Sequence, residues 1–293
     1  MEKITHKALL DAQVHFGHLR RKWNPKMLPF IFGEQKGIHI IDLNRTADKL
    51  EEAASAARSI AKSGRKILFV ATKKQAKEVV KQAATRVGMP FVTERWLGGM
   101  LTNFTTIRKS IKKMQSIEKM LGDGTLESVT KKEKLVLTRE KEKMEKVLGG
   151  VANMNRVPAA LFLVDIIHEN IALKEAQRLN INTFGIVDTN SDPTKVDFAI
   201  PGNDDAATSI AILTNYIADA IAEGLAERAA SNEGNDLAED DDNADNNQFD
   251  GDVNEETGAD GENKGKGPRK RTGGGAGRSR TRTGGGGAPK KTT

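Results

Sequence analysis

The apolar residues of this chain follow two periods, one typical of buried strands and one typical of amphipathic helices. Continuous apolar runs predict strands at residues 37–43, 66–71, 89–93, 158–165 and 182–188. Runs without polar alternation are typical of strands that are buried on both faces of a parallel sheet. Between most of them, apolar residues recur every three or four positions, as on one face of a helix. The pattern therefore predicts an α/β domain, an open parallel sheet of about five strands with helices on both faces.

Two helix starts carry a capping box, in which two side chains satisfy free backbone N–H groups. Thr72 with Gln75 and Thr130 with Glu133 have the required spacing. The last helix of the α/β body is predicted over residues 206–229, where small and apolar residues dominate.

Two glycine pairs, Gly98-Gly99 and Gly149-Gly150, bracket an insertion in the strand–helix alternation. Between them, apolar residues recur at helical steps with bases in the other positions, and residues 122–124 interrupt the pattern. We predict two helices of roughly 17–19 residues, about 25–29 Å long, that pair as an antiparallel hairpin. Residues 102–148 hold 12 bases and 7 acids. The charges fit a docking arm or a surface stabilised by alternating charge, and a protruding basic hairpin favours docking.

The end of the chain differs sharply in composition. Residues 231–293 contain 13 acids and 10 bases, and all the acids precede all the bases. Few apolar residues remain to offset conformational entropy, so we expect a disordered tail. Its basic part resembles RNA-binding arginine–glycine segments, with Arg278, Arg280 and Arg282 as candidate contacts. The predicted divisions are an N-terminal helix and basic/aromatic segment (1–36), an α/β body (37–101 and 150–229), an arm (102–149) and the tail (230–293).

Charge and composition narrow the class of protein. The chain has 46 Lys+Arg and 40 Asp+Glu, so residues 1–230 hold 36 bases and 27 acids, a net charge of +9. This excess fits a polyanionic partner or a merely solvated basic surface. The absence of cysteine excludes disulfides and thiolate metal sites. With no apolar run long enough for a signal peptide or a membrane span, we expect a soluble cytoplasmic protein with no membrane partner.

Bases and aromatic residues are mixed in the N-terminal segment. Three consecutive bases precede Trp23, and further aromatic residues follow at Phe30 and Phe32. Such a mixture can hold phosphates and stack on unpaired bases, and a long loop without structure of its own is usually functional. The alternative is that the aromatic rings only close the edge of the core. We favour RNA contact, with candidate residues Arg20, Arg21, Lys22, Trp23, Asn24 and Lys26.

The turn at residues 72–75 is the best candidate phosphate site in the body. Free N–H groups and the helix dipole attract anions there, and Lys73 and Lys74 add charge. The alternative is an ordinary capped helix with two solvated lysines. Neither glycine fingerprint of a nucleotide-binding loop occurs in the chain. The remaining candidate RNA contacts lie at the insertion boundary and along the arm: Arg95, Asn103, Arg108, Lys109, Lys112, Lys113, Lys131 and Lys132.

Acidic residues gather where strands are predicted to end. Asp188 ends the last strand, and Asp204 and Asp205 precede the final helix. Because open α/β sheets place their sites at the carboxyl ends of strands, these acids and His18 could hold a divalent cation through hard oxygen ligands. Helix capping is the alternative and the safer account. No other cofactor is expected. A small-molecule enzyme on this body remains a second hypothesis, although no nucleophile stands beside a matching histidine.

Seven runs of residues occur in a distinctive order: His15-Phe16-Gly17-His18, Trp23 to Met27, Gly37 to Leu43, Thr72 to Gln75, Arg95 to Phe104, Val187 to Asn190 and Ile200 to Asp205. Over residues 1 to about 229, they resemble the bacterial family of small-subunit ribosomal protein two. Two departures are the acidic-then-basic tail and Ser191, which stands where many members have a cysteine.

The resemblance implies a flavodoxin-like parallel sheet with an inserted α-helical coiled-coil hairpin. It also implies a structural, non-enzymatic protein of the small ribosomal subunit that has no small-molecule substrate. Its expected partners are small-subunit ribosomal RNA and neighbouring ribosomal proteins, including ribosomal protein one.

Overall fold

The computed structural model of the chain describes residues 4–122 and 130–235, which contain two β-sheets. The larger sheet has five parallel strands in the order β5-β4-β6-β7-β8. Numbered along the chain, this order is 2-1-3-4-5, that of flavodoxin-like folds. The predicted α/β class and flavodoxin-like sheet are confirmed. The strands are β4 (Ile67–Val70), β5 (Phe91–Val92), β6 (Ala160–Val164), β7 (Asn182–Val187) and β8 (Phe198–Pro201).

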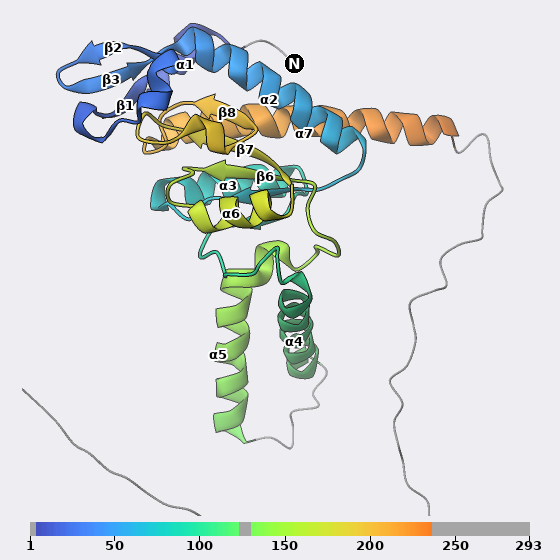
Figure 1. Ribbon diagram of the computed structural model, residues 1–293. Coiled ribbons are helices and arrows are strands. Elements are labelled where there is room, and N and C mark those ends of the chain that lie inside the picture. The colour runs from blue at the N-terminus through green and yellow to red at the C-terminus, as the bar shows by residue number, and fades with distance from the viewer. Residues whose placement is uncertain (1–3, 123–129, 236–293) are drawn as a thin grey trace, which may run out of the picture. The chain divides into compact units, whose positions relative to one another are not determined.

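Both faces of the parallel sheet are covered (Figure 1). Ile67 and Phe69 of β4 pack on one side, against α2 (Leu43–Lys62), α3 (Lys74–Arg86) and α7 (Ala207–Asn235). The alternate β4 residues pack on the other side, against α6 (Asn170–Arg178) and the residues where the arm begins and ends. Because β4 and β6 are buried on both faces, continuous apolar runs were the correct signal for them.

One strand was assigned to the wrong sheet. The first predicted strand is β3 (Ile38–Ile41), and it lies between β1 (Phe16–Leu19) and β2 (Ile31–Gln35) in an antiparallel sheet. Its residues are alternately half-buried and buried, as expected for a sheet covered on one face. The β2–β3 turn has Lys36 and Gly37 at φ 53° and 78°, so the predicted boundary at 36/37 divides a hairpin. The fifth parallel strand is β8, which the sequence prediction missed.

The N-terminal segment is more regular than predicted. After α1 (His6–Asp11) and β1, short 3₁₀ helices occupy Arg20–Lys22 and Pro25–Phe30. The expectation of an unstructured loop was therefore wrong. Asn24 holds this path, since its backbone N–H donates to the Thr189 carbonyl at 2.8 Å and its side chain caps the second 3₁₀ helix.

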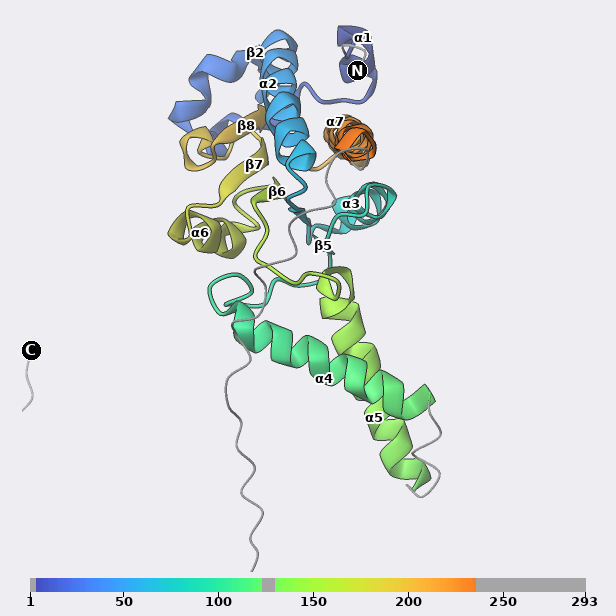
Figure 2. The same ribbon diagram turned by 90° about the vertical axis from the view of Figure 1, so that its right-hand side faces the viewer.

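The insertion forms α4 (Phe104–Gly122) and α5 (Lys131–Leu148), of 19 and 18 residues, as predicted. The two helices leave the body side by side (Figure 2). The predicted apolar stripe of α4 is buried, and the Thr130–Glu133 capping box begins α5. Where the chain returns to the body after α5, a Cβ on Gly150 would lie 2.2 Å from the Phe91 carbonyl oxygen. The close backbone packing at this point therefore requires glycine. Within the described ranges, no helix combines the length and apolarity needed to cross a membrane.

Candidate functional site

Four carboxylates converge at the carboxyl ends of the parallel strands. Asp165 follows β6, Asp188 follows β7, and Asp204 and Asp205 lie between β8 and α7. Asp165, Asp188 and Asp204 are buried, whereas the Asp205 side chain is 54% exposed. Asp188, Asp204 and Asp205 lie at this edge together, since Lys73 contacts Asp204 and Asp205, and His18 contacts Asp188 and Asp205.

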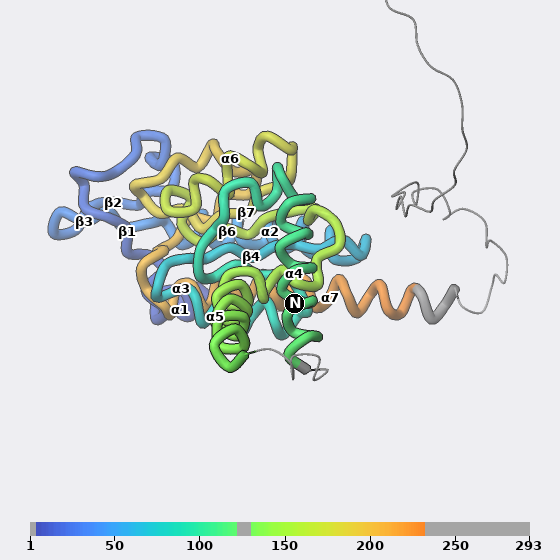
Figure 3. The backbone as a smooth tube through the Cα atoms, turned by 90° about the horizontal axis from the view of Figure 1, so that it is seen from below, coloured from blue at the N-terminus to red at the C-terminus, as the bar shows by residue number. Residues whose placement is uncertain are grey.

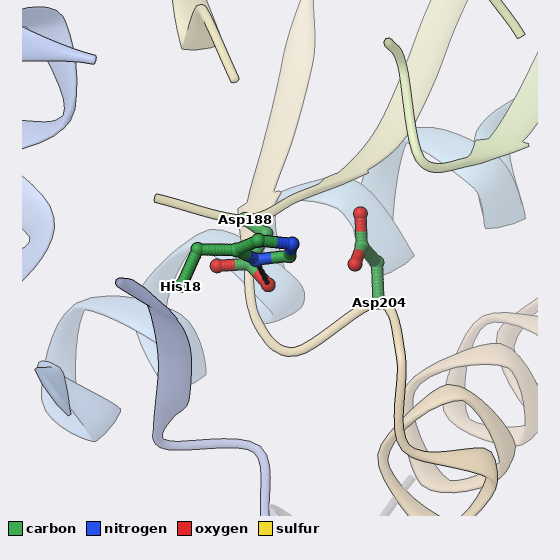
Figure 4. Close-up of side chains that lie close together, drawn as sticks. All are labelled: His18, Asp188 and Asp204. Atoms are coloured by element: carbon green, nitrogen blue, oxygen red, sulfur yellow. Dashed lines mark hydrogen bonds and ion pairs between the residues drawn. The ribbon is translucent and has the colours of Figure 1, made fainter. Parts of the chain in front are cut away.

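His18 reaches this cluster from the antiparallel sheet. Its Nδ1 lies 2.7 Å from Asp188 Oδ2, and its Nε2 lies 3.5 Å from Asp205 Oδ2. In Figure 4 the His18 ring overlies Asp188, and its other nitrogen is on the side of Asp204. The hydrogen bond to Asp188 raises the pKa of His18 above its ordinary value. One ligand atom from each of His18, Asp188 and Asp204 can be chosen so that all three lie within 4.8 Å of one another, as cation ligands do.

Lys73 is not the free phosphate-binding cation that the sequence suggested. Its Nζ lies 2.8 Å from Asp165 Oδ2 and 2.9 Å from both Asp204 Oδ1 and Asp205 Oδ1. Burial lowers the pKa of Lys73, but these carboxylates outweigh it and leave the pKa well above the ordinary value. The lysine is therefore charged and committed to the acidic cluster, while Lys74 remains exposed at the start of α3.

The structure does not support capping as the role of Asp204. The side chain that accepts from the Asp205 and Ala206 N–H groups is that of Asn203. Asp204 is fully buried, and its Oδ2 has no hydrogen-bonding partner among the described residues. Burial first, and then the charges of Asp165 and Asp188, raise the pKa of Asp204 to about 7. A proton or a cation would relieve this repulsion.

The capping box at Thr72 was also wrong, because α3 begins one residue later than predicted, with Lys73 as its N-cap. Thr72 instead donates its backbone N–H and its hydroxyl to Glu169 Oε1, at 2.7 and 2.5 Å. Burial raises the pKa of Glu169, although the Thr72 hydrogen bonds oppose this. The turn after β4 is thus tied to the start of α6 through a side chain 97 residues away.

A further carboxylate, Glu175 of α6, holds the residues where the arm begins, and the sequence prediction missed it. Glu175 accepts from Trp96 Nε1, from the backbone N–H groups of Gly99, Leu101 and Thr102, and from the Thr102 hydroxyl, at 2.7–3.2 Å. Burial raises the pKa of Glu175, but the backbone donors bring it below its ordinary value. No motif identifies such a residue, since a lone glutamate in an amphipathic helix resembles any surface position.

The N-terminal candidate RNA contacts separate into different environments. Arg21 and Lys22 are exposed, and Arg20 is exposed but lies 3.1 Å from Glu34. Trp23 is half-buried against His39, with ring centroids 5.2 Å apart. The other two, Asn24 and Lys26, contact the body, since Lys26 Nζ lies 2.8 Å from Asp192. Thus Arg20, Arg21, Lys22 and Lys26 all present charge to solvent, and Arg20 and Lys26 are each paired with an acid as well.

The candidates on the arm are exposed: Asn103, Arg108, Lys109, Lys112, Lys113, Lys131 and Lys132. Only Lys113 among them has an ion pair recorded within the described residues, with Glu140 of α5 at 2.5 Å. Arg95 is exposed beside the buried Trp96. Arg278, Arg280 and Arg282 lie outside the described residues.

Comparison with known proteins points to one class, the structural proteins of the small ribosomal subunit. The family model described as Ribosomal protein S2 matches residues 9–224. A small ribosomal subunit protein uS2 from Cytophaga hutchinsonii is 61% identical over 239 residues, which cover 82% of this chain and 94% of that protein. The uS2 of Christiangramia forsetii is 59% identical over 77% of this chain and 76% of that protein. The uS2 of Azobacteroides pseudotrichonymphae is 58% identical over 78% of this chain and 87% of that protein.

The chain belongs to the ribosomal protein S2 family. This places it among structural, non-enzymatic proteins of translation, as the sequence resemblance predicted.

Proposed function

We propose that the protein binds small-subunit ribosomal RNA in the cytoplasmic ribosome through its basic surfaces and its helical arm, and that it helps to dock neighbouring ribosomal proteins, including ribosomal protein one. The observation that carries this proposal is the division of α4 into two faces. Its apolar stripe is buried, whereas Arg108, Lys109 and Lys112 are exposed on the rest of the helix. An exposed cationic face on a projecting helix fits a polyanion such as RNA.

Salt dependence tests the RNA-binding part of the proposal. If six to ten phosphates are engaged, affinity for the RNA falls about 10³–10⁵-fold between 50 and 200 mM salt. Replacing Arg108, Lys109 and Lys112 together by alanine should reduce the slope of log affinity against log salt by about 0.7–0.9 per lost phosphate contact, the range for single-stranded and duplex nucleic acid. Lys49→Ala is the control for loss of a lysine away from the arm, because Lys49 lies on α2 with its side chain 42% exposed and 2.6 Å from Glu52. Equal slopes for the triple variant and the wild type contradict the proposal.

We further propose that α4 and α5 act as a coiled-coil docking arm. Replacing residues 105–147 by a short Gly-Ser linker should leave the α/β body folded, because the parallel sheet and α2, α3, α6 and α7 lie outside this segment. The deletion removes Ile107 and Ile111 from the core on one face of the sheet, so some loss of stability is expected. The deletion should impair assembly into the small subunit. Normal incorporation of the deleted protein rules out a docking role for the arm.

A truncation of residues 231–293 should spare incorporation into the small subunit and alter affinity for RNA.

The acidic cluster is proposed to hold a divalent cation through His18, Asp188 and Asp204, with Asp205 at its exposed side. His18 Nδ1 bonded to a carboxylate leaves Nε2 as the ligand atom, an arrangement common in metal sites. Because His18 lies in β1 and the acids follow the parallel strands, the cation would link the two sheets. A cation-dependent rise in melting temperature that Asp204→Asn abolishes tests this proposal.

A further inference from the structure

One face of the antiparallel sheet is apolar and exposed. Phe16 lies opposite Ile40 in the β1–β3 pairing, and Leu19 lies opposite Ile38. Directly opposed residues of an antiparallel pair carry their side chains on the same face. These four apolar side chains therefore share one face of the sheet. Figure 3 shows this sheet at one end of the body, beyond the parallel strands.

A bulge in β2 adds an aromatic ring to the same face. Ile31 lies opposite Ile41 and Gly33 lies opposite Ile40, so Phe32 is the extra residue of a bulge between these two pairs. Phe32 is 80% exposed. A Cβ on Gly33 would meet nothing within 4 Å, so the space above Gly33 on the edge strand β2 is open. We name Phe16, Leu19, Phe32, Ile38 and Ile40 the outer sheet face.

The opposite face of this sheet is already occupied. His39 is buried and packs against Trp23 with the two rings tilted, and His18 points to the acidic cluster. Gly17 lies so close to Thr189 that an added Cβ would clash at 2.5 Å. Trp23 therefore belongs to the covered side, and the aromatic rings open to a partner are Phe16 and Phe32, at 41% and 80% exposure.

The charge around the outer sheet face is predominantly positive. Residues 16–40 contain five bases and one acid, Glu34, which lies 3.1 Å from Arg20. The Arg20 N–H donates to the Gly37 carbonyl at 3.0 Å, which places Arg20 beside the hairpin turn that carries Lys36. Arg21, Lys22 and Lys36 are all exposed. The apolar face thus has a cationic border.

We propose that the outer sheet face is a stacking platform for unpaired nucleotides of RNA. Exposed aromatic rings stack on bases of any identity, and neighbouring cations take the phosphates, which is how sheet surfaces bind single strands. An uncharged apolar protein segment would leave the cationic border without counter-charge. The inference rests on the proposed RNA-binding function and adds the form of RNA that this surface selects.

Binding of the full-length chain to a short single-stranded RNA, compared with a duplex of equal length, tests the proposal by fluorescence anisotropy. The salt concentration is set high enough to weaken phosphate contacts, so that stacking is a larger share of the affinity. Wild type should prefer the single strand. Phe32→Ala should weaken single-strand binding about 5- to 140-fold, the equivalent of about 1–3 kcal/mol for one stacked base, and leave duplex binding unchanged.

Two further variants separate stacking from other effects. Phe32→Trp should restore single-strand affinity, because it keeps a stacking ring. Leu28→Ala is the matched control, since Leu28 is 64% exposed on the neighbouring 3₁₀ helix and should leave affinity unchanged. Equal loss in the control, or no loss in Phe32→Ala, overturns the platform.

Failure of this inference can be told apart from failure of RNA binding as such. A wild type that prefers duplex RNA yet co-sediments with small subunits in a salt-dependent way would remove the platform and leave the proposed function in place. Protection of Phe32 by another ribosomal protein in assembled subunits, with unchanged RNA affinity of Phe32→Ala, would assign the face to a protein and also overturn the inference.

Discussion

Glu175 and Asp204 are both withdrawn from solvent, with residue exposures of 9% and 0%, yet their surroundings differ completely. Glu175 receives five hydrogen bonds, and its pKa lies below the ordinary value. Asp204 faces Asp165 and Asp188 and has one oxygen without a partner, and its pKa rises to about 7. Both carboxylates are buried, so burial does not distinguish them. The number of hydrogen-bond donors around each one does: Glu175 is satisfied within the protein, whereas Asp204 can still accept a ligand.

The two sites also differ in what they connect. Glu175 fastens α6 to the chain segment that leads into the arm, and all its donors come from residues 96–102. The Asp204 cluster joins the two sheets, because His18 comes from β1 and the acids follow β6, β7 and β8. The first junction is complete within the chain. The second has an excess of negative charge, which a cation can neutralise.

The largest effect is expected at Glu175. In Glu175→Gln an amide NH₂ would face donors that now meet a carboxylate oxygen, so buried N–H groups lose their acceptor. We expect a loss of about 3 kcal/mol or more in unfolding free energy. Urea unfolding followed by tryptophan fluorescence measures this loss, since Trp96 contacts Glu175 directly. The exposed Glu142→Gln on α5 serves as control. An unfolding free energy of Glu175→Gln close to that of the wild type would contradict this structural role of Glu175.

A cation should stabilise the protein through Asp204. At a concentration of Zn²⁺ a hundred times its Kd, we expect about 2.7 kcal/mol of stabilisation. For a domain of this size, that corresponds to a rise of about 5–10 °C in melting temperature. Asp204→Asn should remove the rise, and a chelator should reverse it in the wild type. The cation site is refuted if Asp204→Asn shows the same rise as the wild type.

Without a cation, Asp204 should make stability depend on pH. Its pKa is 3.8 ordinarily and about 7 in the folded chain, so the folded state holds the proton more tightly. Stability therefore falls as pH rises between about 4 and 7. The raised pKa of His18 acts in the same direction. Its contribution to stability is complete below pH 6.5, and it is lost as pH rises through the pKa of His18 in the folded protein. Thermal melts across this range should show a smaller slope in Asp204→Asn, and an unchanged slope would assign the dependence to other groups.

The smallest effect is expected at Asp205, which directly follows the buried Asp204 in the chain. Its side chain is 54% exposed, and it contacts Lys73 at 2.9 Å. Burial raises the pKa of Asp205, but Lys73 brings it below the ordinary value. Because solvent screens exposed ion pairs, Asp205→Ala should cost only about 0.2–1 kcal/mol. A loss in chemical unfolding as large as that of Glu175→Gln would show that exposure is a poor guide in this cluster.

The parts of the fold that sequence could predict are those in which local pattern and final environment agree. The β4 and β6 strands are apolar throughout because both of their faces are buried. The apolar stripe of α4 has helical spacing because one face of the helix packs inward. In β3, by contrast, the partners are β1 and β2, and no residue of the strand encodes which sheet will accept it. The strand β8, Phe198–Pro201, follows Asp197 and runs directly into the turn signal Pro201-Gly202, so it was missed.

The candidate site was predictable only where topology brings residues together. Because parallel strands end at one edge, Asp188, Asp204 and Asp205 could be grouped from sequence alone. The position of Lys73 among these acids could not be predicted, since it depends on the direction in which the lysine side chain extends to reach Asp165, Asp204 and Asp205. Glu175 meets donors 73–79 residues away, and its sequence context is that of any exposed glutamate. Such long-range satisfaction of polar groups leaves no local signal.

The insertion of the arm between β5 and β6 has a consequence for synthesis of the chain. In the order β5-β4-β6, the central strand β4 acquires one neighbour early, but its other neighbour begins at Ala160, 90 residues after β4 ends at Val70. At about 5–20 residues per second, the ribosome needs roughly 5–18 s to supply it. During that interval one edge of β4, with Leu68 and Val70, has no partner strand, and a nascent chain in this state is a natural substrate for a chaperone.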